Sequence, residues 1–243
     1  RKKHWKEYFL EFLMIFLAVT LGFFAENIRE HITEHQRAQT FAASMIEDLK
    51  ADTAQLATYN WYYMYAAGKI DTFLNLLSSK DINKIPSGEL YWYGLYCGAH
   101  GSFVPNDATF QQMKSSGAIE LFKTQTAIDV EKYDRFCRSL QRIEEMNNNI
   151  YTEVRKVKAQ IFDFKYNEMA NQVFQQNRKT FSQSRIDSFI ASNPPLLSND
   201  KILFNQLTEL VRSRFIRNYN VAYSDSLLKQ ANIVLDELHK EYR

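Results

Sequence analysis

The chain has 243 residues and a formal net charge of +2, and 45% of its residues are hydrophobic. Residues 1–25 contain four basic and two acidic residues, so the rest of the chain contains 26 of each sign. A body without a basic excess cannot neutralise a phosphate backbone, which argues against nucleic acid as a partner.

An apolar run at residues 8–25 is the first predicted element. It reads YFLEFLMIFLAVTLGFFA, and Glu11 is its one charged residue. At a rise of ~1.5 Å per residue it would extend ~27 Å, close to the hydrocarbon thickness of a bilayer. A cleaved signal peptide has a shorter apolar core and a small-residue cleavage site, whereas the charged stretch ENIRE follows this run. The run therefore predicts a retained transmembrane helix whose partner is the lipid bilayer.

The basic residues beside this run predict its orientation. Four Lys or Arg residues lie in the first six positions, whereas Arg29 and Arg37 on the other flank are diluted by Glu26, Glu30 and Glu34. The positive-inside rule then places the N-terminus in the cytoplasm. In the inner membrane of a bacterium, the predicted segments are a cytoplasmic stub (1–7), a single transmembrane helix (8–25) and a periplasmic helical body (26–243).

Three residues of the run are candidates for contacts inside the membrane. Glu11 lies about one turn into it, and intramembrane carboxylates are costly and often functional. The alternative is that Glu11 snorkels toward Lys6 or the headgroups. Ala18 and Gly22 form a small-xxx-small pair that permits close helix approach. These residues are expected to contact a second copy of the chain or another membrane or envelope protein.

Stripes with heptad spacing predict that the body is built from long helices. The first stripe extends from Ile28 to Leu77, with steps that alternate between three and four residues and without a Pro. Anchor and stalk are therefore predicted to form one continuous helix, ending near residue 79. A second stripe extends from Tyr133 to Phe164 and places Asn147 at a core position.

A third stripe near the end of the chain completes the predicted bundle. It extends from Leu228 to Tyr242, and apolar residues from Leu203 onward begin the same predicted helix. That helix is expected to start at residues 198–200, after Pro194-Pro195. The expected fold class is all-α, with an antiparallel bundle of three to four long helices.

Residues 80–106 are predicted to be a loop-rich insertion at the membrane-distal tip. Four of the seven glycines lie at positions 88–101. Residues 107–122 are expected to form a short helix that Asp107 caps and Gly117 ends or kinks. Cys97, in this insertion, and Cys137 are too few for a disulfide framework, and we expect two free buried thiols, with pairing as the alternative.

An aromatic cluster is the best candidate for a binding surface. Seven of the fourteen Tyr and two of the three Trp lie within residues 59–96. The aromatics at 59–65 point to all sides of a helix, so they cannot all face one seam. Tyr and Trp are enriched at interaction hot spots, and the alternative is a satellite core that holds the insertion. The candidate partner- or ligand-binding residues are Tyr59, Trp61, Tyr62, Tyr65, Tyr91, Trp92, Tyr93 and Tyr96.

The segment His31-Ile32-Thr33-Glu34-His35 matches H-x-x-E-H, a zinc-peptidase pattern. His31 and His35 would lie one helical turn apart, with Glu34 as the base. The sequence names no third ligand, and the segment lies beside the membrane on a charged helix, so a plain charged helix is the expected reading. No P-loop, dinucleotide-binding or nucleophile-elbow motif is present. We therefore expect no catalytic residues, no cofactor and no metal.

Two stretches resemble an uncharacterised family of bacterial single-pass inner-membrane proteins, a domain of unknown function. They are FLEFLMIFLAVTLGFFAENIREH and, at 109–133, TFQQMKSSGAIELFKTQTAIDVEKY, and together they cover about a fifth of the chain. The resemblance implies an inner-membrane location and a helical body. It also implies that Ser115, Ser116 and Gly117 form a helix stop, and it implies no established activity.

These observations favour a non-enzymatic, membrane-anchored scaffold or accessory subunit of a bacterial envelope complex, as an oligomer or bound to a protein partner. The alternative is a periplasmic helical bundle that senses a ligand. The chain is expected to depart from that pattern, because no second span and no output domain is predicted within residues 26–243. A zinc-dependent hydrolase built on H-x-x-E-H is the third possibility.

Overall fold

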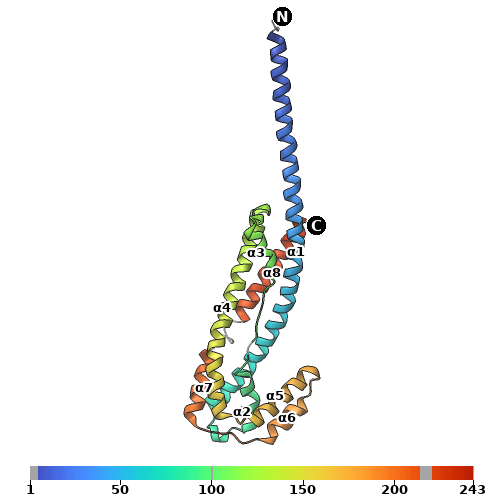
Figure 1. Ribbon diagram of the computed structural model, residues 1–243. Helices are drawn as coiled ribbons and strands as arrows, with labels where there is room; N and C mark the ends of the chain where they lie inside the picture. Colours follow the sequence, from blue (N-terminus) through green and yellow to red (C-terminus); the bar gives the residue numbers. More distant parts are fainter. Residues whose placement is uncertain (1–4, 100, 214–220, 243) are drawn as a thin grey trace. The chain divides into compact units, whose positions relative to one another are not determined.

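The computed structural model describes residues 5–99, 101–213 and 221–242, and the regular structure in these ranges is entirely helical (Figure 1). The predicted all-α fold is therefore confirmed. The elements are α1 (Trp5–Ser79), η1 (Ile82–Lys84), α2 (Ser87–Tyr96), α3 (Ala108–Ser115), η2 (Ala118–Leu121), α4 (Thr124–Ile161), α5 (Phe164–Lys179), α6 (Gln183–Ser192), α7 (Lys201–Ser213) and α8 (Val221–Tyr242).

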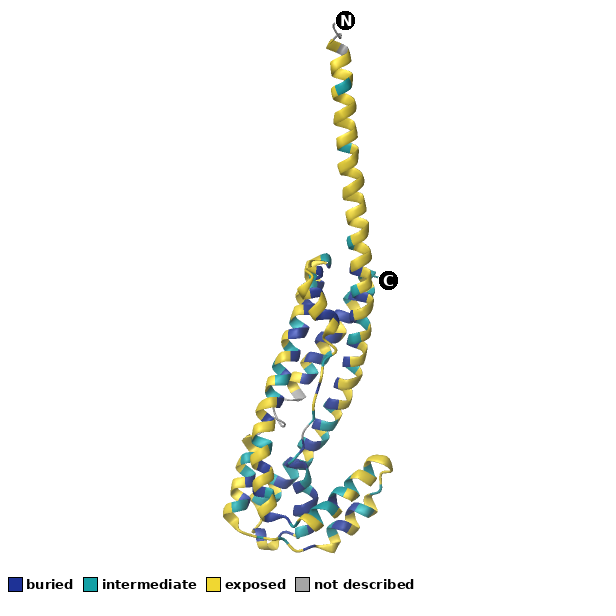
Figure 2. Ribbon diagram, viewed as in Figure 1, coloured by how far each residue is buried: buried dark blue, intermediate teal, exposed yellow. Residues whose placement is uncertain are grey.

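Helix α1 continues without interruption over 75 residues, as the sequence predicts. Its N-terminal part is almost entirely exposed (Figure 2). An 18-residue window in it has a mean hydropathy of 2.1, and none of that window is buried. Among the described helices, α1 alone is long and apolar enough to cross a membrane.

The chain divides into two compact units, and α1, α4 and α8 contribute residues to both. Unit 1 comprises residues 1–50, 106–131 and 233–243, and unit 2 comprises residues 51–105 and 132–232. The first heptad stripe is buried from Ala38 to Phe73. Its predicted first members, Ile28, His31 and His35, are exposed instead. The buried seam begins at Ala38 because packing partners in unit 1 cover α1 only from about that residue (Figure 2).

The helix stop at Ser115–Gly117 lies in unit 1 and ends α3. Gly117 has φ +70°, a left-handed conformation that a glycine adopts without steric cost. The backbone N–H of Ser116 donates to the carbonyl of Gln112 at 3.1 Å. Asp107 stands at the predicted N-cap position of α3, but its side chain makes no capping hydrogen bond.

Three acidic side chains of α4 and α8 lie close together in unit 1. Burial raises the pKa of Glu237 above its ordinary value of 4.5, and the charges of Asp129 and Glu241 raise it further. The Oε2 atom of Glu237 is buried without a hydrogen-bond partner. The Oε1 atom of Glu241, in contrast, accepts a hydrogen bond from Thr126 at 2.9 Å and lies 3.4 Å from Lys123 Nζ.

Glu237→Gln is expected to raise the melting temperature of the chain at neutral pH. A carboxyl group whose pKa is raised in the folded state destabilises the fold once the pH exceeds its ordinary pKa, because the unfolded chain then ionises more readily. The stability gained by Glu237→Gln is therefore expected to vanish below about pH 4, where the carboxyl group is protonated in both states. Circular-dichroism melts of the full chain in detergent, between about pH 4 and pH 8, measure this. Asp236→Asn, which removes an exposed carboxylate of α8, is the control. A gain that is equal at both ends of the pH range contradicts the prediction.

The first part of the predicted loop-rich insertion (80–106) lies in unit 2 and is more regular than the sequence predicts. It contains η1 and the helix α2, whose Leu90, Tyr91, Trp92 and Tyr96 are buried. The many glycines indicate a loop, but two of them serve close packing. A Cβ on Gly94 would lie 2.9 Å from the Phe162 ring. A Cβ on Gly88 would lie 2.1 Å from the carbonyl oxygen of Ile190.

A clamp of hydrogen bonds fixes α2 against the residues that follow α4 and α6. Asn193, with φ 44°, ends α6, and its Oδ1 accepts hydrogen bonds from Ser87 Oγ at 2.9 Å and from the Gly88 N–H at 3.3 Å. The Tyr91 hydroxyl donates to the Pro195 carbonyl at 2.9 Å and accepts from the Asp163 N–H at 2.9 Å. The Pro194-Pro195 stretch, predicted only as a helix breaker, thus also holds α2.

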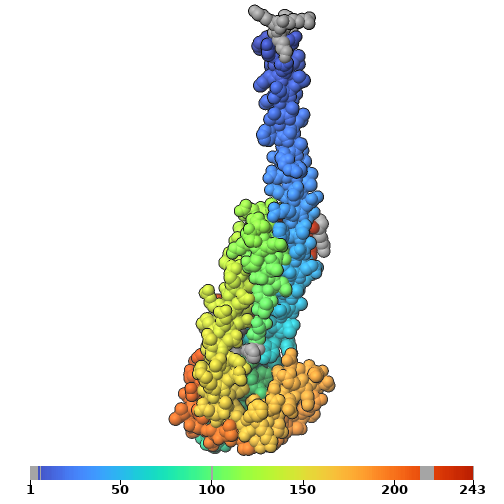
Figure 3. Space-filling view, in the orientation of Figure 1, coloured from blue at the N-terminus to red at the C-terminus, as the bar shows by residue number. Residues whose placement is uncertain are grey.

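The second heptad stripe ends earlier than the sequence predicts. Helix α4 stops at Ile161, and Asp163 caps a new helix, α5, by accepting a hydrogen bond from the Lys165 N–H at 2.8 Å. The predicted stripe residue Phe164 is therefore 80% exposed. Asn147 is buried, as predicted. The sequence did not predict the hairpin of α5 and α6, which forms a lobe of unit 2 (Figure 3, orange).

The start of α7, in the last part of unit 2, agrees with the sequence prediction. Helix α7 starts after Asp200, whose Oδ1 accepts a hydrogen bond from the Ile202 N–H at 2.8 Å. Residues 214–220, in the predicted helix that joins the third stripe to Leu203, lie outside the described residues. Cys97 and Cys137 are both buried, and neither forms a disulfide bond.

Candidate functional site

The predicted aromatic cluster lies in unit 2, where its members differ in exposure. Tyr59, Tyr91, Trp92 and Tyr96 are buried, whereas Trp61 is 66% exposed. The half-buried members are Tyr62, Tyr65 and Tyr93. Part of the cluster is therefore core, in line with the alternative that the sequence left open. Tyr91 belongs to the α2 clamp and not to a surface.

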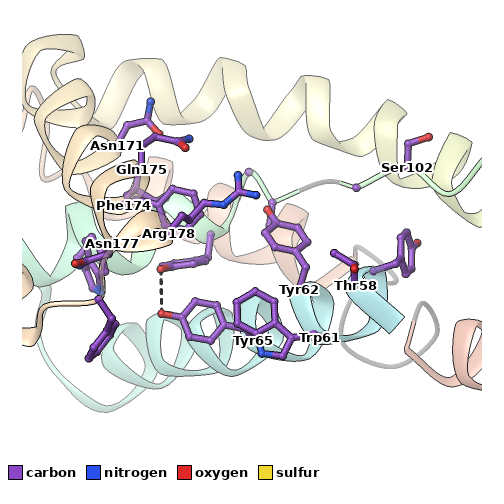
Figure 4. Close-up of a pocket in the computed structure, with 18 of the residues that line it drawn as sticks. Thr58, Trp61, Tyr62, Tyr65, Ser102, Asn171, Phe174, Gln175, Asn177 and Arg178 are labelled. Atoms are coloured by element: carbon purple, nitrogen blue, oxygen red, sulfur yellow. Dashed lines mark hydrogen bonds between the residues drawn. The ribbon is translucent and has the colours of Figure 1, made fainter. Parts of the chain in front are cut away.

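Most members of the aromatic cluster surround a pocket of about 990 Å³ within unit 2 (Figure 4). Its walls come from α1, α2, residues 98–99 and 101–102, α4, and the hairpin of α5 and α6. Six of the eight predicted residues line it, and Tyr91 and Tyr93 do not. The aromatic lining residues are Tyr59, Trp61, Tyr62, Tyr65, Trp92, Tyr96, Tyr151, Phe174 and Phe181.

The aromatic rings of the pocket are ordered by contacts with each other. The Trp61 and Tyr65 rings are stacked, with centroids 5.6 Å apart and planes at 8°. The Tyr96 ring packs edge to face with the rings of Tyr65 and Phe174, and the ring centroids are 5.7 Å apart in both pairs. The Tyr96 hydroxyl donates to the Tyr65 hydroxyl at 3.5 Å, the dashed line in Figure 4. The pocket therefore presents flat, mutually supported apolar surfaces, the usual lining of a small-molecule site.

Burial raises the pKa of the Tyr96 hydroxyl, and its hydrogen bond with Tyr65 raises it further. The Tyr96 side chain therefore stays protonated and neutral throughout the physiological pH range. It contributes a hydroxyl group to the pocket but no charge.

The polar lining of the pocket comes mainly from α5. Asn171, Gln175, Asn177 and Arg178 belong to this helix, and Arg178 is the one charged side chain among the lining residues of the described chain. Arg178 points from the last turn of α5 toward Tyr62 of α1 (Figure 4). A cation in the last turn is also favourable because of the helix dipole.

One side-chain atom of Asn177, Nδ2, has no hydrogen-bond partner within the described residues. Its Oδ1 accepts a hydrogen bond from the Ser182 N–H at 2.9 Å, which identifies the other amide atom as the donor Nδ2. Nδ2 is buried and has no hydrogen-bond partner within the described residues. A buried donor without an acceptor is costly, and a ligand oxygen or a bound water would satisfy it.

Two cationic side chains also lie over the rings of pocket aromatics. Lys69 Nζ is 5.2 Å from the Tyr65 ring centroid, and the Arg155 guanidinium is 5.7 Å from that of Tyr151. Neither Lys69 nor Arg155 lines the pocket, but each adds positive potential close to it.

Sequence reasoning identified the α1 and α2 walls of this pocket and missed the α5 wall. Phe174, Asn177 and Arg178 lie in the stretch NQVFQQNR, which has no heptad stripe. The signal that could have found it is an Asn- and Gln-rich amphipathic helix with a single Phe. No sequence rule brings residue 178 next to residue 62.

Unit 2 also contains a buried polar cluster. The Tyr133 hydroxyl donates to Asp52 Oδ2 at 2.5 Å, and both side chains are buried. Burial raises the pKa of the Cys137 thiol to about 12. At neutral pH this thiol is therefore protonated, and a protonated buried thiol is not a nucleophile. Burial likewise raises the pKa of Glu144, which accepts a hydrogen bond from the Phe103 N–H at 3.0 Å. The cluster is part of the core.

The H-x-x-E-H segment and the predicted membrane contacts lie on α1 in unit 1. His31 and His35 are exposed, and His31 Nδ1 lies 3.8 Å from Glu34 Oε2. No group of three or more His, Cys, Asp or Glu side chains in the described residues is placed to hold a metal ion. Ala18 and Gly22 are exposed on α1, and Glu11 is partly exposed.

No protein-family model, curated protein sequence or solved structure matches the chain. The resemblance of its two stretches to an uncharacterised membrane-protein family therefore stays a prediction. The pocket of unit 2 is the feature from which a function can be inferred.

Proposed function

We propose that this chain is a non-enzymatic, membrane-anchored binding protein that takes a small ligand in the aromatic pocket of unit 2. The N-terminal part of α1 would hold it in the inner membrane of a bacterium, with residues 1–7 in the cytoplasm and the helical body in the periplasm. The observation that carries the proposal is the pocket itself, with its stacked rings and its unpaired amide donor.

The chemistry of the lining favours binding over catalysis. The described lining residues contribute rings, hydroxyls, amides and one guanidinium, and they include no Asp, Glu, His or Cys. General acid-base and nucleophilic catalysis depend mainly on those side chains. The volume of about 990 Å³ lies at the upper end of the ~300–1,000 Å³ that is usual for small-molecule sites.

A thermal-shift screen tests the proposal. The full chain in mild detergent is melted with a panel of anionic, neutral and cationic small metabolites. At least one compound is expected to raise the melting temperature, because a ligand that binds only the folded state stabilises it. The shift is expected to disappear in Trp61→Ala and to persist in Met64→Ala, which truncates an exposed α1 residue outside the pocket. A panel without any shift, or equal shifts in both variants, contradicts the proposal.

The scaffold or accessory-subunit function that the sequence favours is the second candidate. The observation in its favour is that Trp61 and Phe181, both at the pocket, are 66% and 70% exposed. Exposed aromatic side chains are typical anchors of protein interfaces. This function predicts an oligomer or co-purifying membrane proteins in mild detergent, measured by native mass spectrometry. A strictly monomeric particle without partners contradicts it.

A further inference from the structure

The charge of the pocket in unit 2 determines which ligands it favours. Among its described lining residues, Arg178 is charged and none is acidic. The Arg178 guanidinium makes no ion pair or hydrogen bond with another described residue, and the side chain is exposed at the pocket. Arginine presents a planar set of donors that matches a carboxylate, sulfonate or phosphate group.

The second donor lies one residue away on the same helix. Asn177 lines the pocket, and its Nδ2 atom is buried without an acceptor, while the Oδ1 of the same amide is occupied by the Ser182 N–H. Arg178 and Asn177 together therefore offer N–H donors without a matching acceptor in the protein. This deficit favours a ligand group that is rich in oxygen acceptors and negatively charged.

The remaining walls favour a flat ring. Trp61 and Tyr65 are stacked with their planes at 8° and form one continuous face on α1, and Phe174 of α5 also lines the pocket. Lys69 lies over the Tyr65 ring and Arg155 over the Tyr151 ring, so the aromatic walls lie in a positive potential. Cationic ligands are therefore disfavoured, although aromatic walls alone would accept them.

We propose that the pocket selects aromatic anions: a planar ring that packs against Trp61 and Tyr65, bearing an acidic group that Arg178 and Asn177 bind. This inference rests on the proposed ligand-binding function and adds the charge and shape of the ligand. The preference for anions over neutral ligands comes from Arg178 and Asn177 of α5, whose N–H donors have no acceptor in the protein. The stacking surface supplies affinity for charged and neutral rings alike.

A matched pair of fluorescent probes tests the inference. 5-Dimethylaminonaphthalene-1-sulfonate is an aromatic anion, and its sulfonamide is a neutral ring of nearly the same size. The chain has three Trp residues, and two of them, Trp61 and Trp92, line the pocket. In the full chain carrying Trp5→Phe, energy transfer from tryptophan to a probe therefore reports binding in the pocket. Titrations into detergent alone provide the blank.

The sulfonate is expected to bind at least about tenfold more tightly than the sulfonamide, because a charge-assisted contact exceeds a neutral one by that order. Arg178→Gln is expected to raise the Kd of the sulfonate about tenfold and to leave that of the sulfonamide unchanged. Lys179→Gln, which removes a charge from the same helical turn outside the pocket, is the matched control. Asn177→Asp, which keeps the acceptor for Ser182 but adds a negative charge, is also expected to weaken only the sulfonate.

Three outcomes overturn the inference. Equal affinity of the two probes, or an unchanged sulfonate Kd in Arg178→Gln, shows that the pocket does not select anions, while the ligand-binding function stands. Binding of neither probe overturns the aromatic-anion preference, and the thermal-shift panel then decides separately whether the pocket binds ligands of another class.

Discussion

Replacing Gly88 with alanine is expected to lower the free energy of unfolding by about 3 kcal/mol, because a Cβ there has no space. The Cβ would lie 2.1 Å from the carbonyl oxygen of Ile190 and 2.8 Å from its Cα. Both are backbone atoms, so the clash cannot be relieved by turning a side chain. Relief requires α2 to move away from α6, which breaks the hydrogen bonds from Ser87 and Gly88 to Asn193.

Chemical denaturation of the full chain in detergent measures this effect, with tryptophan fluorescence as a probe of the region around Trp92. Gly68→Ala on α1 is the matched control. A Cβ on Gly68 meets nothing within 4 Å, so this variant is expected to stabilise the helix by about 0.5–1 kcal/mol. A Gly88→Ala protein that unfolds at the wild-type denaturant concentration would show that α2 does not pack as described.

Tyr133→Phe is expected to lower the free energy of unfolding by about 2–4 kcal/mol, since it removes a hydrogen-bond donor from a buried carboxylate. Asp52 is 0% exposed and Tyr133 is 4% exposed. The Tyr133 hydroxyl donates to Asp52 at 2.5 Å. Burial and the charge of Asp52 both raise the pKa of Tyr133, so its hydroxyl remains the donor at every physiological pH.

A double-mutant cycle gives this prediction its sharpest test. Asp52→Asn removes the buried charge, so the added cost of Tyr133→Phe is expected to be much smaller in that background. Tyr223→Phe on α8, where the side chain is 39% exposed, is the control for loss of a hydroxyl. Equal costs of Tyr133→Phe with and without Asp52→Asn would mean that the hydrogen bond to Asp52 does not stabilise the core.

The sequence by itself determined the features that depend on local periodicity. The apolar run and the heptad stripe predicted one helix through residue 79, and α1 ends at Ser79. Gly117 was predicted to end or kink the short helix that starts after Asp107, and it supplies a left-handed turn there. These predictions succeed because spacing along a helix and the conformational freedom of glycine are properties of a few neighbouring residues.

Only the tertiary structure decided how α2 and α5 are used. The glycines of α2 resemble those of a loop, and their role in close packing depends on Ile190 and Phe162, far away in the sequence. Tyr91 and Tyr62 have the same side chain but different roles. Tyr91 belongs to the α2 clamp because its hydroxyl bonds to Pro195 and Asp163, whereas Tyr62 lines the pocket.

The polar residues of the pocket likewise could not be identified from the sequence alone. Arg178 and Asn177 have neighbours within their own helix that indicate only a solvated surface. They become a candidate site because the hairpin of α5 and α6 brings them opposite the aromatic face of α1. Long-range packing of this kind is set by the summed burial of many apolar side chains. The sequence pattern therefore identified the ring surface, and the fold supplied the donors that give it a charge preference.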